Sequence, residues 1–241
     1  MNYLLKINYD GSAFKGFAKQ PRQRTIQGEI EAAIEKIYGV KVKTVGSGRT
    51  DAGVHALAQF VSFSCGRDLS VLKMKKSLNA VLPDEIRVEK AEVVDEFFSA
   101  RFSAKQKIYE YVLVFEYDAF NFRFAELVPI NFNLNLAKKG ARYLVGKHDF
   151  KSFSASDSDV RDFVKTIHYI KFVKTDKGIN IRVCGSGFLH NMVRIIVGTL
   201  LDCGTGKIKP RKVKEILDGQ DRRLAGKTAP AKALFLKEVI Y

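Results

Sequence analysis

The stretch TIQGEIEAAIEKIYG, residues 25–39, predicts the first helix of the chain. Its apolar residues recur at the spacing of one helix face, and Gly39 follows as a stop signal. That face consists of Ile26, Ile30, Ala33, Ile34 and Ile37. Before the helix, YLLKINY at 3–9 is β-prone and ends at the turn signal DGS, residues 10–12. The chain therefore opens with a strand and an amphipathic helix.

The remaining pattern of the first hundred residues predicts two strands, a helix and a strand. We expect strands at 41–45, 59–63 and 86–94 and a helix at 71–81. The resulting order, β-α-β-β-α-β, is the split order of ferredoxin-like folds.

The second half of the chain repeats this mixture less regularly. We expect strands at 108–115, 166–174, 179–184 and 233–240, and helices at 134–145, 189–201 and 210–217. The predicted fold class is α+β, with two ferredoxin-like (RNP-like) halves whose mainly antiparallel sheets join side by side. Helices would cover one face, and a cleft would lie between the halves. The predicted domains are residues 1–104 and 105–241.

Composition excludes several classes of protein. Of the 241 residues, 46% are hydrophobic, which is enough to bury a core and excludes wholesale disorder. No apolar run reaches the ~18 residues of a membrane helix, and the N-terminus lacks the pattern of a signal peptide. The three cysteines, Cys65, Cys184 and Cys203, have neither the even number of a disulfide framework nor the spacing of a zinc site. We expect a reducing, cytoplasmic location.

The charge balance predicts a polyanionic partner. Lysine and arginine number 41 against 26 acidic residues, which gives a net charge of +15. Residues 1–104 contribute 16 basic and 12 acidic residues, and residues 105–241 contribute 25 and 14, so the net charges are +4 and +11. Nucleic acid is the commonest large polyanion in cytoplasm, although a lysine-rich solubility surface is the alternative. Phosphate contacts are expected mainly in the second half.

The most unusual run is GRTDAGVHA at 48–56. It matches neither the Walker loop nor the dinucleotide fingerprint, so a phosphate-binding loop is the weaker interpretation. An Arg-x-Asp triplet between glycines places a carboxylate beside a cation on a loop, where chemistry is often located. The alternative is that Thr50 or Asp51 only forms an Asx-type turn. His55 lacks a partner at metal-ligand spacing and is more typical of a structural histidine.

Seven segments, in order, resemble the TruA-type tRNA pseudouridine synthase family, and together they cover nearly the whole chain. They are YDGSAFKGF (9–17), GRTDAGVHA (48–56), NAVLPDEIRV (79–88), FSARFSAKQKIYEYVL (98–113), GKHDFKSF (146–153), GSGFLHNMVRIIVGTLLDCGTG (185–206) and AGKTAPAKALFLKEVIY (225–241). The resemblance implies an enzyme that isomerises uridine to pseudouridine in the anticodon stem-loop of tRNA, without a cofactor or a metal. It further implies a homodimer that binds tRNA.

The same resemblance assigns the catalytic carboxylate to Asp51, in the N-terminal domain. Asp51 would act as a nucleophile toward the sugar or the base, or would remove the C2′ proton to give a glycal, and the sequence leaves these routes open. Arg194 matches the arginine that pairs with the catalytic aspartate, and its place in an apolar helix requires a partner. The alternative for Arg194 is a snorkelling surface side chain. Arg49 would help to extrude the target base or would contact a nearby phosphate.

Further substrate-binding positions follow from the resemblance. Tyr109 matches the tyrosine that stacks on the base, whereas Tyr111, on the same strand face, is expected in the core. Leu234 matches an apolar position of the pocket. Lys107 replaces the usual arginine, so it keeps the charge but loses the bidentate fork. Other departures are Gly16-Phe17-Ala18, where the family has glycine-tryptophan-glutamine, and Ala233, where a glycine is usual.

Two rival functions remain on sequence grounds. A catalytically inactive RNA-binding module would fit the charge and the split order equally well. The joint presence of Asp51, Arg194 and Tyr109 favours the enzyme, because binding alone needs no desolvated carboxylate. An enzyme acting on free uridine is disfavoured by the net charge and by the missing phosphate loop.

Overall fold

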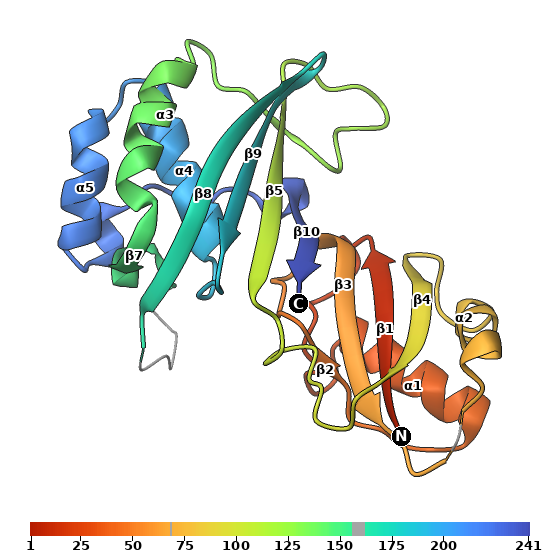
Figure 1. Cartoon of the computed structure of the whole chain (residues 1–241). Coiled ribbons are helices and arrows are strands. Elements are labelled where there is room, and N and C mark those ends of the chain that lie inside the picture. The colour runs from red at the N-terminus through yellow and green to blue at the C-terminus, as the bar shows by residue number, and fades with distance from the viewer. Residues whose placement is uncertain (68, 156–161) are drawn as a thin grey trace. The chain divides into compact units, whose positions relative to one another are not determined.

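A computed structural model describes residues 1–67, 69–155 and 162–241 (Figure 1). The described residues form an α+β fold with five α-helices and a mixture of antiparallel and parallel strand pairs. They divide into two compact units. The first contains Met1–Lys105 and Phe235–Tyr241, and the second contains Gln106–Leu234. The last strand thus belongs mostly with the first unit, and the predicted domains 1–104 and 105–241 stay a prediction. None of the helices in the described part is long and apolar enough to cross a membrane.

The first unit has the chain order β-α-β-β-α-β followed by the last strand. Its elements are β1 (Asn2–Tyr9), α1 (Ile26–Tyr38), β2 (Val45–Gly46), β3 (His55–Ser64), α2 (Val71–Asn79), β4 (Ile86–Val94) and β10 (Leu234–Ile240). The predicted first helix is confirmed. Thr25 is its N-cap, with a side chain that accepts from the Gly28 amide, and Gly39 ends it at φ 65°.

The sheet of the first unit is centred on β1 and β3. β1 pairs antiparallel with β4 on one side and with β3 on the other. The other edge of β3 is shared by two short pairings. β2 pairs antiparallel near the end of β3, with Val45 opposite Ser62, and β10 pairs parallel at its start, with Phe235 opposite His55. The start of β3 is therefore held by strands from both ends of the chain.

The predicted strand at 41–45 is wrong except for its last residue, because β2 covers only Val45–Gly46. The reason lies at Thr44. Its amide and its hydroxyl both donate to the Glu31 carboxylate, and its carbonyl accepts from the Gln27 side chain. Side chains of α1 thus satisfy backbone groups that a neighbouring strand would otherwise satisfy.

The second unit packs helices against an antiparallel sheet. Its elements are β5 (Gln106–Val114), β6 (Glu126–Leu127), α3 (Leu134–Ala141), β7 (Gly146–Asp149), β8 (Val164–Thr175), β9 (Gly178–Gly185), α4 (Met192–Gly204) and α5 (Pro210–Asp218). The strand order is β5-β9-β8-β7, and β6 adds a short parallel pairing to β5. Figure 1 shows the three helices of this unit gathered together beside the sheet. α4 is the most buried of them.

The predicted strands and hairpin of this unit are confirmed, but three details differ. The helix predicted at 134–145 ends as an α-helix at Ala141, and a 3-10 turn over Arg142–Leu144 follows it. The short strands β6 and β7 were not expected from the sequence. The helix predicted at 189–201 begins only at Met192, because Asn191 has a left-handed backbone, φ 59° and ψ 5°, that cannot continue a helix toward its N-terminus.

Candidate active site

The loop at residues 48–53, called here the aspartate loop, connects β2 to β3 and carries Asp51 near its centre. Thr50, the residue before Asp51, is buried and bonded twice. Its hydroxyl lies 2.7 Å from the Tyr9 hydroxyl, and its carbonyl accepts from the Phe17 amide at 3.0 Å. The Val54 amide donates to the Asp51 carbonyl at 3.1 Å and closes the turn. The backbone on both sides of Asp51 is therefore fixed.

Two glycines allow residues 9–17 to lie against the aspartate loop. A Cβ on Gly16, whose φ is +93°, would lie 2.9 Å from the Thr50 carbonyl oxygen. A Cβ on Gly11 would lie 2.0 Å from the Val54 carbonyl oxygen, which is a severe clash. A side chain at either position would thus push the two segments apart. This close packing explains physically why the motif at 9–17 accompanies the motif at 48–56.

The start of the aspartate loop is held from β3. The Ser47 hydroxyl bonds to the Gln59 side-chain oxygen, and the Gln59 amide group donates to the Gly48 carbonyl at 2.9 Å. The Ser47 amide donates to Phe60 O at 2.8 Å. Both Ser47 and Gln59 are buried. These bonds are worth more inside the protein than at its surface, because an unmade bond would leave a buried polar group unsatisfied.

Within this loop, Asp51 is half-buried and Arg49 is exposed. The loop thus presents a carboxylate and a cation two residues apart on a backbone that is bonded at Ser47, Gly48 and Thr50. A carboxylate that keeps part of its surface accessible can reach a substrate, and a rigid support keeps its position defined.

His55, the first residue of β3, is buried and supports the same region. Its Nδ1 lies 3.0 Å from the Gly11 amide, which donates to it, and its ring stacks on Phe235 with centroids 4.8 Å apart. These contacts fit the structural interpretation of His55.

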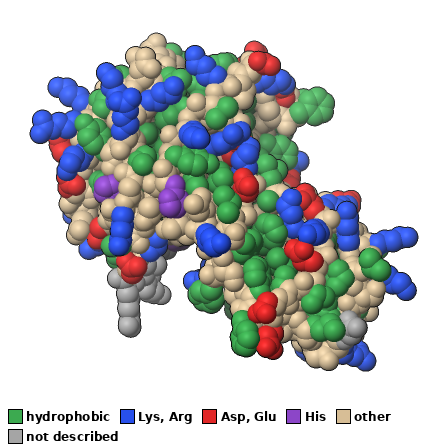
Figure 2. Space-filling view, viewed as in Figure 1, with side chains coloured by type: hydrophobic (Ala, Val, Ile, Leu, Met, Phe, Trp, Pro, Cys, Tyr) green, Lys and Arg blue, Asp and Glu red, His purple; other side chains and the backbone are tan. Residues whose placement is uncertain are grey.

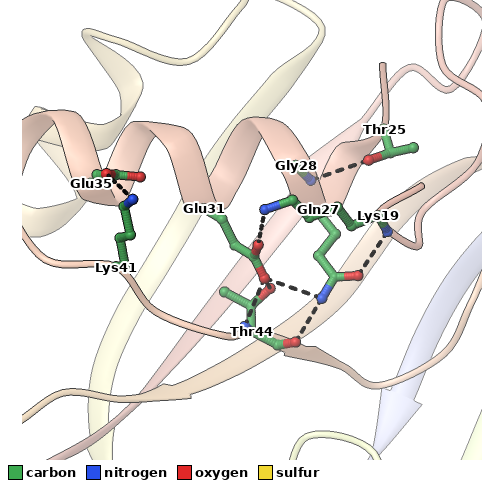
Figure 3. A network of polar contacts seen from close by, with 8 residues as sticks. All are labelled: Lys19, Thr25, Gln27, Gly28, Glu31, Glu35, Lys41 and Thr44. Carbon is green, nitrogen blue, oxygen red and sulfur yellow. Dashed lines mark hydrogen bonds and ion pairs between the residues drawn. The ribbon is translucent and has the colours of Figure 1, made fainter. Parts of the chain in front are cut away.

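A polar network on α1, which sequence reasoning did not find, holds the segments around Lys19 and Thr44 (Figure 3). The Glu31 carboxylate accepts from the Lys19 ammonium at 2.9 Å and from the Thr44 amide at 3.0 Å. Gln27, one turn earlier, accepts from the Lys19 amide and donates to the Thr44 carbonyl. The signal that could have revealed this network is the position of Glu31, a carboxylate next to the apolar face of the helix. Burial by itself raises the pKa of Glu31, but the bonds from Thr44 and Lys19 outweigh it and lower the pKa.

In the second unit, Tyr109 and Tyr111 lie on one face of β5, as the alternation predicted. The Tyr109 side chain is buried, and its ring meets Phe188 edge to face with centroids 5.2 Å apart. Tyr111 is fully buried, and its hydroxyl has no hydrogen-bond partner among the described residues. Burial raises the pKa of Tyr111 well above its ordinary value. Tyr111 is therefore a core residue.

Arg194 lies in the first turn of α4 and is half-buried. Its Nε donates to the Ala229 carbonyl at 2.7 Å, and its Nη1 donates to the Asn191 side-chain oxygen at 2.8 Å. Ala229 in turn donates its amide to the Arg194 carbonyl at 3.1 Å. These bonds hold Arg194 inside the fold, so it is not a snorkelling surface side chain.

The two remaining predicted site residues, Lys107 and Leu234, lie on β-strands. Lys107 is half-buried on β5, opposite Gly185 of β9. Leu234 is buried at the start of β10. Asp51 and Arg49 belong to the first unit, whereas Lys107, Tyr109, Arg194 and Leu234 belong to the second.

The comparison with known families decides what kind of protein carries these residues. A family model described as tRNA pseudouridine synthase matches residues 6–103 and 141–241. The chain belongs to the tRNA pseudouridine synthase family. Asp51, Arg49, Arg194 and Leu234 of this tRNA pseudouridine synthase fall inside the matched residues, and Lys107 and Tyr109 fall outside them.

Curated relatives extend the match to the full chain. The chain is 46% identical to tRNA pseudouridine synthase A of Bacillus licheniformis over 239 residues, which cover 98% of this chain and 97% of the relative. It is 44% identical to the protein of the same name from Bacillus subtilis, with the same coverage, and 40% identical to that of Caldicellulosiruptor bescii, over 100% of this chain and 99% of the relative. A chain in the solved structure of a Cbf5-Nop10-Gar1 complex is similar at 12% identity with a TM-score of 0.36, over 83% of this chain and 54% of that one, which is too slight to carry an argument.

The described residues of this synthase contain no cluster of metal-ligating side chains. No group of three or more His, Cys, Asp or Glu side chains among them could hold a metal ion. The cysteines Cys65, Cys184 and Cys203 are buried and not joined in disulfides.

Proposed function

We propose that this family member isomerises uridine to pseudouridine in the anticodon stem-loop of tRNA. The observation that carries the proposal is the match to relatives named tRNA pseudouridine synthase A, which extends over nearly the whole of both chains at 40% to 46% identity. The reaction breaks the C1′–N1 bond, turns the uracil and forms a C1′–C5 bond, while a proton leaves C5 and N1 gains one. Atoms and electrons balance within the uridine, so no co-reactant is consumed.

Asp51 is the proposed catalytic residue. Its half-buried carboxylate, on a loop that is bonded on both sides, supports this role. It would add to the sugar or the base, or it would remove the C2′ proton so that the base departs and returns to a glycal. Both routes need a carboxylate that is ionised, close to C1′, and held still while the free base turns.

The supporting residues have separate proposed roles. Arg194 would keep Asp51 ionised, as a nearby cation does for a carboxylate that loses water. Arg49, exposed on the same loop as Asp51, would contact a phosphate or help to extrude the target nucleotide. Tyr109 would stack on the extruded uracil, and Leu234 would line the pocket. Lys107 would contact phosphate as a point charge, without the bidentate geometry of an arginine.

Architecture and partners complete the proposal. We propose that the two units are ferredoxin-like halves whose sheets join side by side, with the active site in the cleft between them. The resemblance supports a homodimer that works on tRNA in the cytoplasm. The net charge of +15 supports the RNA partner.

The deciding experiment is incubation with an unmodified tRNA transcript, followed by mapping of pseudouridine at each uridine. We expect product at uridines of the anticodon stem-loop. A transcript in which those uridines are replaced by cytidines is the matched control. The rival function, an RNA-binding module without catalysis, would give binding of both transcripts and no pseudouridine in either.

A further inference from the structure

The residue before α4 does not act as an ordinary helix cap. Asn is a favoured N-cap because its side-chain oxygen accepts from a backbone amide of the first turn. Asn191 occupies the N-cap position of α4, but its side chain makes no such bond. Its oxygen instead accepts from Nη1 of Arg194, three residues later, at 2.8 Å.

The backbone at Asn191 is part of this arrangement. With φ 59° it lies in the left-handed region, which costs energy for any residue except glycine, though asparagine tolerates it best. A strained residue persists only where the surrounding structure holds it, and such residues cluster at functional sites. At Asn191 the side-chain oxygen accepts a hydrogen bond from the Arg194 guanidinium.

A second acceptor fixes the other side of the guanidinium. Nε of Arg194 donates to the carbonyl of Ala229 at 2.7 Å, and the Ala229 amide donates back to the Arg194 carbonyl at 3.1 Å. The guanidinium is a rigid planar fork, so two acceptors on different nitrogens define both its position and its plane.

The Ala229 carbonyl is itself held in place by close packing. A Cβ on Gly198 of α4 would lie 1.8 Å from the Lys227 carbonyl oxygen, so only a glycine lets the two segments approach. The Gly226 amide donates to the Thr199 hydroxyl at 3.0 Å. Residues 225–229 therefore form a fixed support along the first turns of α4. They supply the backbone acceptor of the Arg194 guanidinium, and Asn191 supplies its side-chain acceptor.

We infer that Asn191 is a positioning residue for the reaction, which orients the Arg194 guanidinium by accepting a hydrogen bond from its Nη1. The inference rests on the proposed function, in which Arg194 serves the catalytic carboxylate. Asn191 itself need not touch the RNA, and its contribution passes entirely through Arg194.

The test starts with Asn191→Gly, which keeps the left-handed backbone and removes the acceptor. The single-turnover rate at saturating enzyme should fall about tenfold or more, because one charge-assisted hydrogen bond is lost. Affinity for tRNA and the melting temperature should stay close to those of the wild type. The matched control is Asn131→Gly, since Asn131 is also left-handed, with φ 63°, but exposed. It should keep the wild-type rate.

Two further variants separate positioning from a merely structural role. Asn191→Asp keeps an acceptor oxygen and should recover much of the rate that Asn191→Gly loses. Arg194→Lys lacks the two-nitrogen fork, so adding Asn191→Gly to it should slow the reaction less than twofold. Such a result would show that the effect of Asn191 on the rate depends on the arginine at position 194.

Three results would overturn the inference: an unchanged rate in Asn191→Gly, an equal loss in Asn191→Asp, or the same fold-loss in the Arg194→Lys background. A wild-type protein that forms no pseudouridine would instead refute the proposed function. If Asn191→Gly fails to fold, the comparison of Asn191→Asp with the wild type decides, because a retained rate supports the inference and a tenfold loss contradicts it.

Discussion

The phenol oxygen of Tyr9 lies 2.7 Å from the hydroxyl oxygen of Thr50, and both are buried. Thr50 directly precedes Asp51, so a residue at the end of β1 fixes the backbone beside the candidate catalytic carboxylate. Burial raises the pKa of Tyr9 well above its ordinary value, although the bond to Thr50 opposes the shift. The phenol therefore stays protonated and keeps this contact throughout the physiological pH range.

Tyr9→Phe should loosen the aspartate loop. The Thr50 hydroxyl would lose its buried partner, which costs about 1–3 kcal/mol in free energy of unfolding. We expect a lower single-turnover rate with little change in tRNA affinity, because the loop carries chemistry. Tyr3→Phe is the matched control, since Tyr3 is also a buried tyrosine of β1 but bonds to the Leu69 amide. It should lose stability and keep its rate, and an equal loss of rate in both variants would contradict the role of Tyr9.

Asp51→Asn should abolish isomerisation and leave tRNA affinity within a few-fold of wild type. The reason is that the carboxylate serves the reaction, and an amide of the same shape cannot act as a nucleophile or base. The measurement is pseudouridine formation under single-turnover conditions together with a binding titration. Asp84→Asn, whose side chain is almost fully exposed, is the control and should remain active. Substantial turnover by Asp51→Asn would end the assignment.

Arg194→Ala should change the pH dependence of the rate. A carboxylate that loses its cationic partner is protonated more easily, so the rate should collapse near neutral pH and recover partly as the pH rises. Arg194→Lys should be impaired less, because the ammonium keeps the charge. Single-turnover rates across a pH series test this, with the exposed Arg223→Ala as a control that should keep the wild-type profile. If Arg194→Ala differs from wild type only in affinity, Arg194 is an RNA contact.

Glu31→Gln should destabilise the protein in a pH-dependent way. The folded-state pKa of Glu31 is lowered, so its ionised form stabilises the fold above the unfolded pKa of about 4.3, and this contribution is lost as pH falls through the folded value. We expect a loss of about 1–3 kcal/mol at pH 7 that shrinks below about pH 4. Denaturant titrations at both pH values measure it. Glu35→Gln, an exposed residue one turn later (Figure 3), should show little loss at either pH.

Binding of tRNA should weaken steeply with salt. Each neutralised phosphate releases counterions, and residues 105–241 carry a net charge of +11. On the face seen in Figure 2, lysine and arginine side chains are spread over the surface among acidic ones. We expect the affinity to fall about tenfold or more between 50 and 200 mM salt, if a few phosphates are contacted. A tRNA affinity that does not change with salt concentration would show that the positive charge only maintains solubility.

Sequence periodicity predicted most of the fold, because strand alternation and helix faces are local patterns. Helix α1 and the β8–β9 hairpin follow directly from it. The failures occurred where a side-chain contact or an unusual backbone conformation decides the local structure. Thr44 is kept out of a strand by Glu31, thirteen positions earlier, and the start of α4 is set by the left-handed Asn191.

The candidate site was located only in part. The glycine-rich composition drew attention to the aspartate loop, and the resemblance singled out Asp51 within it. Neither the composition nor the resemblance predicted the contacts that support this loop, because Tyr9 and Thr50 are 41 positions apart and meet only in the folded chain. One partner of Arg194, Ala229, was missed for the same reason, because it is 35 positions away.

The pairing of β10 with the start of β3 has a consequence for how the chain is made. The strand that closes this edge, next to the aspartate loop, is synthesised after the whole of the second unit. At 5–20 residues per second, the ribosome needs roughly 6 to 26 s to make the intervening residues. During that interval the nascent first unit has an open strand edge, which is a site for mispairing with other chains. A prematurely terminated product would keep that edge, so only a chain translated through β10 can complete the sheet at the start of β3.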